Sequence, residues 1–408
     1  MSLLSVGDAQ KRVLDRGNAI AATESVHLDR AQGRILAQDI VSRLTQPPFD
    51  ASAMDGYALR ADDAVDIGSE LTVIGAAAAG HAFDGKVGPG ETVRIFTGAP
   101  VPEGADTILI QEDAEKLDGN RIRTTFAVTR GRHIRPRGQD FAEGETVLKS
   151  GIFMDYTHVT LAAATNHDVI DVYKKPLVAI LATGDELVSP GGTPGPSQIV
   201  ASNTHGIAAL ARECGADILD LGIARDNRVA IATCIDRARK AGADILVTVG
   251  GASVGDHDLV QSALLGSGMT LDFWRIAMRP GKPLMVGSLG DIQVLGLPGN
   301  PVSSMVCALL FLEPLILKMA RKAEKRREAV AVTTSDIASN DKRQDYMRAS
   351  LKRTEDGKLY ATAFDKQDSS MMKIFARSDC LIIRAPHAPA LSAGEETAIL
   401  LLRPFAGA

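Results

Sequence analysis

Alternation of strand-like and helix-like segments after Pro176 constrains the fold of this chain most. Three near-continuous apolar runs, PLVAILATG, ADILDLGI and ADILVTVGG, are separated by NTHGIAALAREC and RVAIATCIDRARKAG, which have helical spacing. Runs that are apolar on both faces are typical of strands buried in a parallel sheet, with helices as right-handed crossovers. Asn203 is placed to cap the first helix and Gly215 to end it. The sequence therefore predicts an α/β domain over residues 176–325.

The rest of the 408 residues predicts smaller parts around this domain. Residues 41–149 place Gly, Pro and Thr between short alternating stretches such as TVRIFTG and TILIQED, which indicates a β-rich second domain with few helices. Helical spacing at 5–20, where Ser5 can act as cap, and at 156–164 assigns residues 1–40 and 150–175 to a small linker domain. Residues 326–408 are strand-like again and predict a C-terminal β domain. The expected fold class is an α/β and β multidomain chain.

Composition narrows the functional classes. The chain has 45 basic and 50 acidic residues, and a net charge of −5 argues against a general nucleic-acid binder. Its four cysteines lie far apart among apolar neighbours without a CxxC pair, as reduced core thiols do. The first residues lack an apolar signal core, and no run approaches membrane-spanning length. We therefore expect a cytoplasmic protein that binds neither nucleic acid nor membrane.

Four loops follow the predicted strands and are rich in Gly, Asp, Glu and Ser. They read ATGDELVSPG, GIARDN, GGASVGDHD and LPGNPVSSM. Ligands bind at the carboxyl ends of strands in parallel sheets, so the fold would bring these loops together. For any single loop, a glycine turn with solvated acids is an equally good interpretation. Convergence of four such loops favours a ligand site.

The loop GGASVGDHD combines features of anion and cation sites. Gly250, Gly251 and Gly255 permit positive φ and close backbone approach, so that amide N–H groups can face an anion, and Ser253 adds a hydroxyl. The two aspartates of the same loop, Asp256 and Asp258, would repel that anion unless a cation lay between them. A phosphate bound together with a divalent cation would account for both the glycine amides and the two aspartates. Mg²⁺ prefers such carboxylate and phosphate oxygens.

Further charges stand in neighbouring loops. Glu186 and Asp226 follow other strands and are candidate carboxylates for the same cation. Arg279 and Lys282 in MRPGKP are candidate cations for an anion, although such side chains are usually only solvated. The sequence therefore predicts a local site for a phosphate and a metal ion.

The stretch LPGNPVSSM predicts a turn followed by a helix. Gly299 and Asn300 form a turn between two prolines, and Ser303 and Ser304 open an apolar helix that runs through Leu312. The first amides of such a helix favour a phosphate or another oxyanion. The alternative is a plain turn with a serine cap.

Seven motifs in order carry a family resemblance: FDASAMDGYALR, RIFTGAPVPEGADTILIQED, RPRGQD, TGDEL, GGASVGDHD, RPGKP and LPGNPVSS. Over nearly the whole chain the sequence resembles the molybdopterin molybdotransferases, known as MoeA in bacteria and as the E domain of gephyrin in animals. The resemblance implies insertion of molybdate into adenylylated molybdopterin with release of AMP, the last step of molybdenum cofactor synthesis. It also implies an elongated four-domain homodimer with a parallel-sheet molybdopterin-binding domain. Its active site would lie between that domain and the β-rich domain of the other subunit.

The resemblance also implies roles for individual residues. Catalytic positions would be Asp55, Thr97, Glu186, Asp226 and Asp258, with Asp55 and Thr97 facing the site from the partner subunit. Glu186 and Asp258 would hold Mg²⁺, with Zn²⁺ as the alternative ion. Together with the loop chemistry above, substrate binding is expected for Gly250, Gly251, Ser253, Gly255, Lys282, Pro298, Gly299, Asn300, Pro301, Ser303, Arg348 and Ser370. Among these, Lys282, Ser303, Arg348 and one serine of the pair 369–370 match the molybdate side.

Two other functions remain open on the sequence. A related α/β fold with similar GGxSxG loops adenylylates molybdopterin with ATP, so the chain could be a molybdopterin adenylyltransferase. SAMDGYA and the flanking β domains argue against this. A non-catalytic scaffold is the second alternative, and the lack of a long linker and a second α/β domain argues against it. Expected partners are a second copy of the chain, a molybdopterin adenylyltransferase and molybdoenzyme acceptors.

Overall fold

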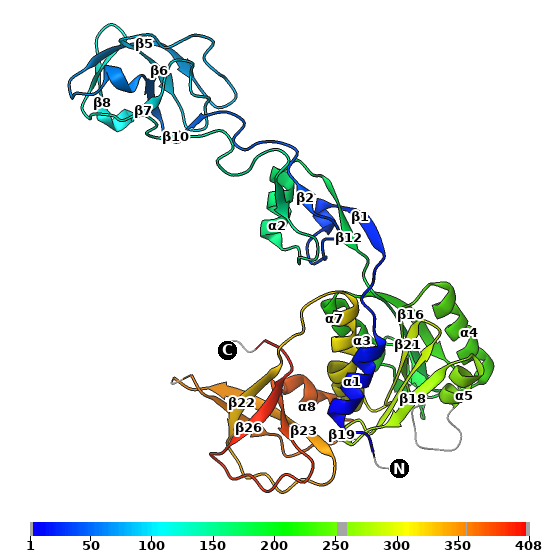
Figure 1. Ribbon diagram of the computed structural model, residues 1–408. Helices are drawn as coiled ribbons and strands as arrows, with labels where there is room; N and C mark the ends of the chain where they lie inside the picture. The colour runs from blue at the N-terminus through cyan, green and yellow to red at the C-terminus, as the bar shows by residue number, and fades with distance from the viewer. Residues whose placement is uncertain (1–2, 251–258, 356, 405–408) are drawn as a thin grey trace. The chain divides into compact units, whose positions relative to one another are not determined.

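The computed structural model describes residues 3–250, 259–355 and 357–404. The chain forms two compact units, coloured along the chain in Figure 1. Unit 1 contains Met1–Glu24, Gly33–Ile35 and Tyr173–Ala408. Unit 2 contains Ser25–Gln32 and Leu36–Val172. Unit 2 is therefore inserted into the chain of unit 1.

A six-stranded sheet forms the centre of unit 1. Its order is β16-β13-β17-β21-β20-β18, and the first four strands run parallel. This confirms the predicted parallel sheet, to which β20 and β18 add antiparallel pairs. From β13 the chain goes first to β16 on one side and then to β17 on the other, so a crevice opens at the carboxyl ends of β13 and β17. The strands are β13 (Leu177–Thr183), β16 (Asp217–Ala224), β17 (Ile245–Val249), β18 (Thr270–Arg275), β20 (Pro283–Leu289) and β21 (Ile292–Leu297).

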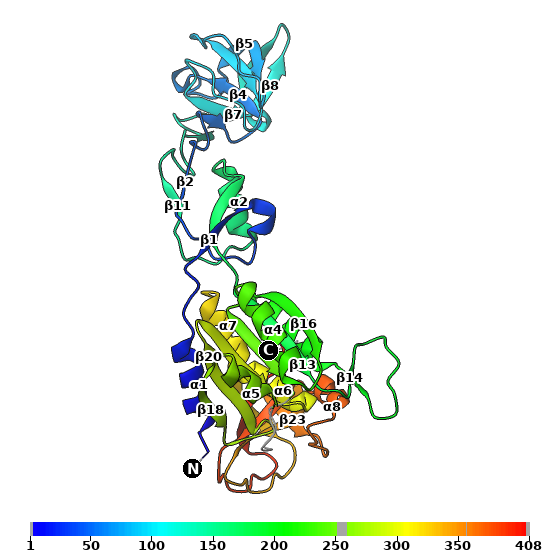
Figure 2. The same ribbon diagram turned by 90° about the vertical axis from the view of Figure 1, so that its right-hand side faces the viewer.

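Helices cover both faces of this sheet. In Figures 1 and 2 helices α1, α3 and α7 lie on one side and α4 and α5 on the other, and each side has its own apolar core. The N-terminal helix α1 packs in the first core against the helix that begins at residue 301, and its Gln10 amide donates to Leu310 O at 3.1 Å. The helices are α1 (Val6–Arg16), α3 (Asn203–Cys214), α4 (Arg228–Lys240) and α5 (Leu259–Gly266). A two-stranded pair, β14 (Leu187–Val188) and β15 (Ile199–Val200), lies outside the main sheet.

The helix ends test the sequence predictions. Ser5 caps α1, since its Oγ accepts from Asp8 N at 3.1 Å, and Gly215 ends α3 in the left-handed conformation. Both predictions are confirmed. The prediction for Asn203 is wrong: it is the first helical residue, Ser202 holds the cap position, and neither caps with its side chain. The Asn203 amide is used elsewhere, as described below.

The apolar helix after the Pro-Gly-Asn-Pro turn is longer than predicted. It begins at Pro301 and continues to Met319 through α6 (Pro301–Cys307), the π-helical segment η4 (Ala308–Leu312) and α7 (Glu313–Met319). By length and composition these 19 residues could cross a membrane, so the expectation that no run reaches that length is wrong. However, 83% of the apolar window is buried inside unit 1, as in a core helix.

The C-terminal part of unit 1 is a closed β-barrel. The pairs β23–β24, β24–β22, β22–β26, β26–β25 and β25–β23 close a ring. The short strand β19 (Met278–Arg279), from the α/β part, adds to the barrel beside β23. The barrel elements are β22 (Glu328–Thr333), β23 (Gln344–Arg353), β24 (Leu359–Ala363), β25 (Cys380–Arg384), β26 (Glu396–Leu401) and one helix, α8 (Met372–Arg377).

Unit 2 contains a six-stranded sheet and a smaller helical part. The sheet has the order β7-β4-β6-β5-β9-β8 and an apolar core on each face. Between residues 41 and 149, all of them described, the only helices are two short 3-10 turns, η2 (Ala61–Asp63) and η3 (Gln111–Asp113), as expected. The sheet strands are β4 (Gly56–Leu59), β5 (Glu70–Ala77), β6 (Glu91–Ile95), β7 (Thr107–Ile110), β8 (Ala114–Leu117) and β9 (Arg121–Thr124).

The smaller part of unit 2 has its own core around helix α2 (Tyr156–Ala164), which has the predicted bounds. Asp155 and His158 form a capping box at its start. Strands β1 and β12 cross the sequence boundary between the two units. The remaining elements are β1 (Thr23–His27), η1 (Leu28–Arg30), β2 (Ile40–Val41), β3 (Ala51–Ser52), β10 (Ile134–Arg135), β11 (Thr146–Leu148) and β12 (Val169–Tyr173).

Candidate functional site

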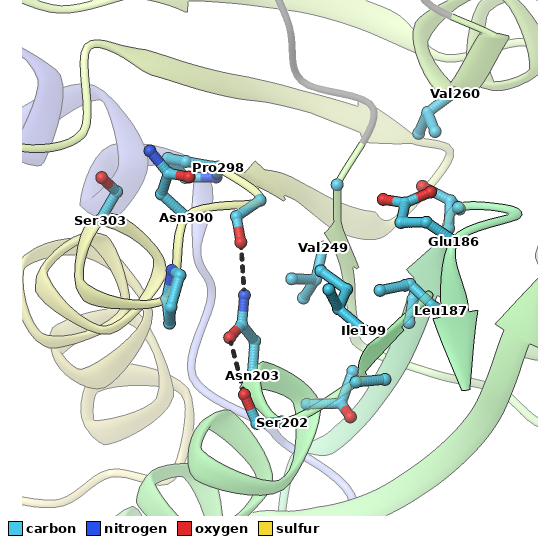
Figure 3. A pocket seen from close by; sticks show the side chains of 18 of the residues that line it. Glu186, Leu187, Ile199, Ser202, Asn203, Val249, Val260, Pro298, Asn300 and Ser303 are labelled. Carbon is cyan, nitrogen blue, oxygen red and sulfur yellow. Dashed lines mark hydrogen bonds between the residues drawn. The ribbon is translucent and has the colours of Figure 1, made fainter. Parts of the chain in front are cut away.

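A cavity of about 770 Å³ lies at the carboxyl ends of β13, β17 and β21 in unit 1. The loops after these strands and after β16 all contribute to it, so the predicted convergence is confirmed for their described residues. Figure 3 shows Pro298, Asn300 and Ser303 on one side and Glu186 and Leu187 on the other. The predicted site residues that line it are Glu186, Asp226, Gly250, Pro298, Gly299, Asn300, Pro301 and Ser303.

The floor of the cavity is formed where β13 and β17 end. Gly250 has φ +93, and a Cβ there would lie 2.6 Å from Thr183 O, so positive φ and close backbone approach are confirmed at this position. Its N–H donates to Leu297 O at 3.3 Å, so the prediction that this amide faces an anion is not confirmed. The hydroxyls of Thr183 and Thr248 are buried and have no hydrogen-bond partner among the described residues. Gly251, Ser253, Gly255, Asp256 and Asp258 lie outside the described residues.

Two acidic side chains line the cavity. Glu186 and Asp226 are both exposed, and neither forms an ion pair with a described residue. The Glu186 carboxylate lies against Gly184, where a Cβ would come within 2.5 Å of Oε2. The backbone N–H of Asp226 donates to Asp185 Oδ1 at 3.3 Å, which joins the two acidic loops. Within the described residues no cluster of three acidic, His or Cys side chains is placed to hold a metal.

The Pro-Gly-Asn-Pro turn forms the opposite wall and is held by side chains. Asn203 Nδ2 donates to Gly299 O at 2.7 Å, a bond drawn in Figure 3, and Ser304 Oγ donates to Pro298 O. The helix begins at Pro301 with Asn300 in the cap position, so the expectation that the serines open the helix is wrong by two residues. The Ser304 hydroxyl instead stabilises the turn through its bond to Pro298 O.

The C-terminal barrel reaches the same turn. Asn300 Nδ2 donates to Ser369 Oγ at 2.8 Å, and Val302 N donates to Ser369 O at 3.0 Å. Of the serine pair, Ser369 therefore contacts the turn, while Ser370 Oγ donates to Asp368. Arg348 is 1% exposed and donates to Gln367 Oε1 and Asp368 O, so it holds the loop that presents Ser369. Neither Arg348 nor Ser370 lines the cavity.

The two predicted cations of MRPGKP differ. Arg279 pairs with Asp345 and lies 3.8 Å from an Asp341 oxygen, so its charge is used to join β19 to the barrel. Lys282 is exposed, has no ion pair among the described residues and does not line the cavity, although its neighbour Pro283 does.

Asp55 and Thr97, the predicted site residues of unit 2, lie together. The Asp55 carboxylate accepts from both Thr97 N and Thr97 Oγ1 at 2.7 Å. These bonds, first the backbone bond, and then the charge of Arg94 hold the pKa of Asp55 below its ordinary value. Gly56 follows Asp55 and begins β4, and its small size is required by the sheet, because a Cβ there would lie 2.0 Å from Leu109 O on β7.

Sequence reasoning missed several residues that line the cavity or shape it. Asn203 was interpreted as a cap, and only its contact with a turn 96 residues away reveals its use. Thr183 begins the TGDEL motif, but no role was predicted for its hydroxyl at the end of β13. Leu187, Ile199 and Val200 form an apolar wall, and the loop between them gave no signal beyond Gly and Pro.

Three family models match the chain. They are the MoeA N-terminal region (domain I and II) at residues 4–165, the probable molybdopterin binding domain at 179–318, and the MoeA C-terminal region (domain IV) at 330–402. The cavity described above is built mainly from residues within the second match.

Curated relatives and a solved structure agree over nearly the full length. The chain is 32% identical to the molybdopterin molybdenumtransferase of Haemophilus influenzae, over 97% of this chain and 98% of the relative. It is 34% identical to the protein of that name from Nostoc, over 93% and 89%. The crystal structure of the molybdopterin biosynthesis MoeA protein of Pyrococcus horikoshii superposes with a TM-score of 0.83 at 29% identity, covering 99% of this chain and all of that one. The chain therefore belongs to the MoeA family of molybdopterin molybdenumtransferases.

Proposed function

We propose that this protein transfers molybdate into adenylylated molybdopterin with release of AMP, the last step of molybdenum cofactor synthesis. The observation that carries the proposal is the cavity lined by Glu186 and Asp226, both without ion-pair partners in the described chain, and by the turn at Gly299 and Asn300. Figure 3 shows Glu186 and Asn300 on opposite sides of it. Acidic oxygens and backbone N–H groups on opposite walls suit a substrate that carries phosphate together with a metal ion. The names of the curated relatives support the same activity.

Electrostatics define what the residues of this chain must do. A pterin phosphate joined to AMP is a polyanion and molybdate is a second anion, so bringing them together costs repulsion. With a net charge of −5 the chain has no general basic field to offset this cost. Lys282, exposed and unpaired within the described chain, is the candidate cation beside the cavity. Binding of the AMP half would position the dithiolene, because fixed geometry lowers the entropy cost of the reaction.

A divalent ion suits the two carboxylates that line the cavity. Mg²⁺ is commonly held by one or two carboxylates together with substrate phosphates and retained waters, and Glu186 and Asp226 provide such a set. The expected ligand Asp258 lies outside the described residues, and Zn²⁺ is the alternative ion. When bound, the ion would polarise a phosphoanhydride oxygen. The protein side chains would orient the phosphate beside the ion.

The assay that tests this function compares two reactions. Molybdate-dependent release of AMP from adenylylated molybdopterin is the expected result. ATP turnover in the presence of molybdopterin and without molybdate would instead identify a molybdopterin adenylyltransferase. Absence of both activities from folded protein would contradict the enzymatic proposal and favour the non-catalytic scaffold.

We propose that the protein acts as a homodimer whose sites combine Asp55 and Thr97 of one subunit with Glu186 of the other. The support is the family resemblance together with the fixed Asp55–Thr97 pair, whose lowered pKa keeps a carboxylate ready to face a ligand. Two-fold symmetry would give two such mixed sites.

Complementation tests this arrangement. Inactive Asp55→Asn and inactive Glu186→Gln subunits, exchanged at random, should regain roughly a quarter of wild-type activity, because half of the dimers carry one intact site. No recovery after verified exchange would place each site within one chain. A molybdopterin adenylyltransferase and molybdoenzyme acceptors are the proposed functional partners. Buried, unpaired thiols at all four cysteines support a cytoplasmic location.

A further inference from the structure

The backbone carbonyls of residues 298–300 in the turn are all hydrogen-bonded within the protein. Pro298 O accepts from Ser304 Oγ, Gly299 O accepts from Asn203 Nδ2 at 2.7 Å, and Asn300 O accepts from Ser304 N at 2.9 Å. Three successive carbonyls are thus satisfied by groups of α3 and α6. Their directions are fixed, because each bond ends on a helix that packs in the core.

The N–H groups of the same peptide units have no such partners. A trans peptide directs its N–H opposite to its C=O, and the peptide bonds of this turn are trans. The N–H groups of Gly299 and Asn300 meet no acceptor among the described residues, and both residues are exposed and line the cavity. The turn therefore offers two backbone donors to a ligand.

Asn203 stands at a helix start but does not cap the helix, and its side chain holds this turn instead. A helix start favours an Asn, Asp, Ser or Thr side chain that accepts from the first N–H groups, which stabilises by ~1 kcal/mol. At the start of α3 no side chain does so. The Asn203 amide instead reaches Gly299, 96 residues away, and its Oδ1 lies 3.4 Å from Ser202 Oγ, which can donate to it. With Oδ1 facing Ser202, the NH₂ group must face the carbonyl.

We propose that Asn203 is a positioning residue that aims the Asn300 N–H at a tetrahedral oxyanion in the cavity. This inference rests on the proposed function, in which the oxyanion is either a phosphate of the nucleotide substrate or molybdate. Asn203 does so by fixing the Gly299 carbonyl on the opposite edge of the same peptide. Without this bond the peptide can rotate, and the donor is no longer preorganised.

Calorimetric binding of AMP and adenosine, which differ by the phosphate, tests this role in folded full-length protein. In Asn203→Ala the Kd of AMP should rise about tenfold, ~1.4 kcal/mol, because the donor to the charged phosphate is no longer held in place, whereas the Kd of adenosine should stay unchanged. The matched control is Asn340→Ala. Asn340 Nδ2 donates to Arg343 O at 2.7 Å, so its loss removes the same kind of bond in unit 1 without touching the turn.

Titration with molybdate alone separates the two sources of oxyanion. Selective loss of AMP binding in Asn203→Ala assigns the donor to the phosphate, and selective loss of molybdate binding assigns it to molybdate. Equal weakening of AMP and adenosine, unchanged binding of AMP and molybdate, or the same AMP-selective loss in Asn340→Ala would overturn the proposal. The proposed function is judged separately, by molybdate-dependent AMP release from the wild-type protein.

Discussion

The two halves of the helix between Pro301 and Met319 differ in whether the carboxylates near them are paired. Near its start, Glu186 and Asp226 face a cavity without ion-pair partners in the described chain. In its second half, Glu313 is 3% exposed, and its two carboxylate oxygens accept hydrogen bonds from Nε and Nη2 of Arg327. Lys325 Nζ lies 3.4 Å from Glu313 Oε2. Arg327 also donates to the carbonyls of Leu401 and Leu402 on the barrel side. Carboxylates with full sets of partners join the parts of unit 1, and those without partners remain available for a ligand.

The pKa of Glu313 reflects this pairing. Burial alone would raise the pKa, but the hydrogen bonds and charge of Arg327, and then Lys325, hold it below the ordinary value of 4.5. A depressed pKa means that the pair stabilises the fold above the unfolded pKa. That stabilisation is lost as the pH falls through the lower, folded value.

The largest expected effect is on stability. Glu313→Gln leaves the Arg327 guanidinium buried without its counter-charge, and breaking such a pair costs about 3–5 kcal/mol of unfolding free energy. Urea unfolding at neutral pH measures the loss. The difference from wild type should shrink as the pH falls from 4.5 through the lower pKa of folded Glu313, because the wild-type carboxylate is then protonated as well. A loss under 1 kcal/mol at neutral pH, roughly that of a surface pair, would remove the contrast drawn between the two halves of the helix.

The matched change at the cavity should affect activity in place of stability. Glu186→Gln should lower molybdate-dependent AMP release at least tenfold, ~1.4 kcal/mol of transition-state stabilisation, with an unchanged urea midpoint. The exposed, unpaired state of Glu186 is the reason. Full activity in this variant would show that its lack of partners has no functional meaning. A lowered midpoint would show that Glu186 also supports the fold.

The smallest expected effect separates the two cations of MRPGKP. Lys282→Met should raise the KM for molybdate about fivefold, ~1 kcal/mol, with little change in AMP affinity, because one exposed cation is lost from a chain without a basic field. Arg279→Met removes the ion pair with Asp345 and should therefore lower the stability of the protein more than its affinity for molybdate. Equal losses of AMP and molybdate affinity in Lys282→Met would assign Lys282 to the nucleotide.

Regular periodicity was sufficient to predict much of unit 1. Uniformly apolar strands and the capping of α1 by Ser5 follow from local rules, and the carboxyl ends of parallel strands placed Glu186, Asp226 and the turn around one cavity. The antiparallel strands β18 and β20 were not foreseen, since the residues of a strand do not show its direction in the sheet.

Residues whose use depends on a distant partner could not be assigned from the sequence. Asn203 has the type and place of a helix cap, and its bond to Gly299 exists only because α3 and the turn meet in three dimensions. Ser369 and Arg279 are likewise explained by contacts with parts of unit 1 far away in the chain.

The insertion of unit 2 into the chain of unit 1 has a consequence for synthesis on the ribosome. The apolar side of α1, with Val6, Ala9 and Val13, is covered by a helix that is translated about 300 residues later. Most of unit 2 is a continuous stretch, Leu36–Val172, and its cores can form as soon as that stretch emerges. At ~5–20 residues per second, α1 must wait roughly 15–60 seconds for its partner. During that interval, exposed apolar surface at the start of the nascent chain is a binding site for chaperones before it becomes part of a core.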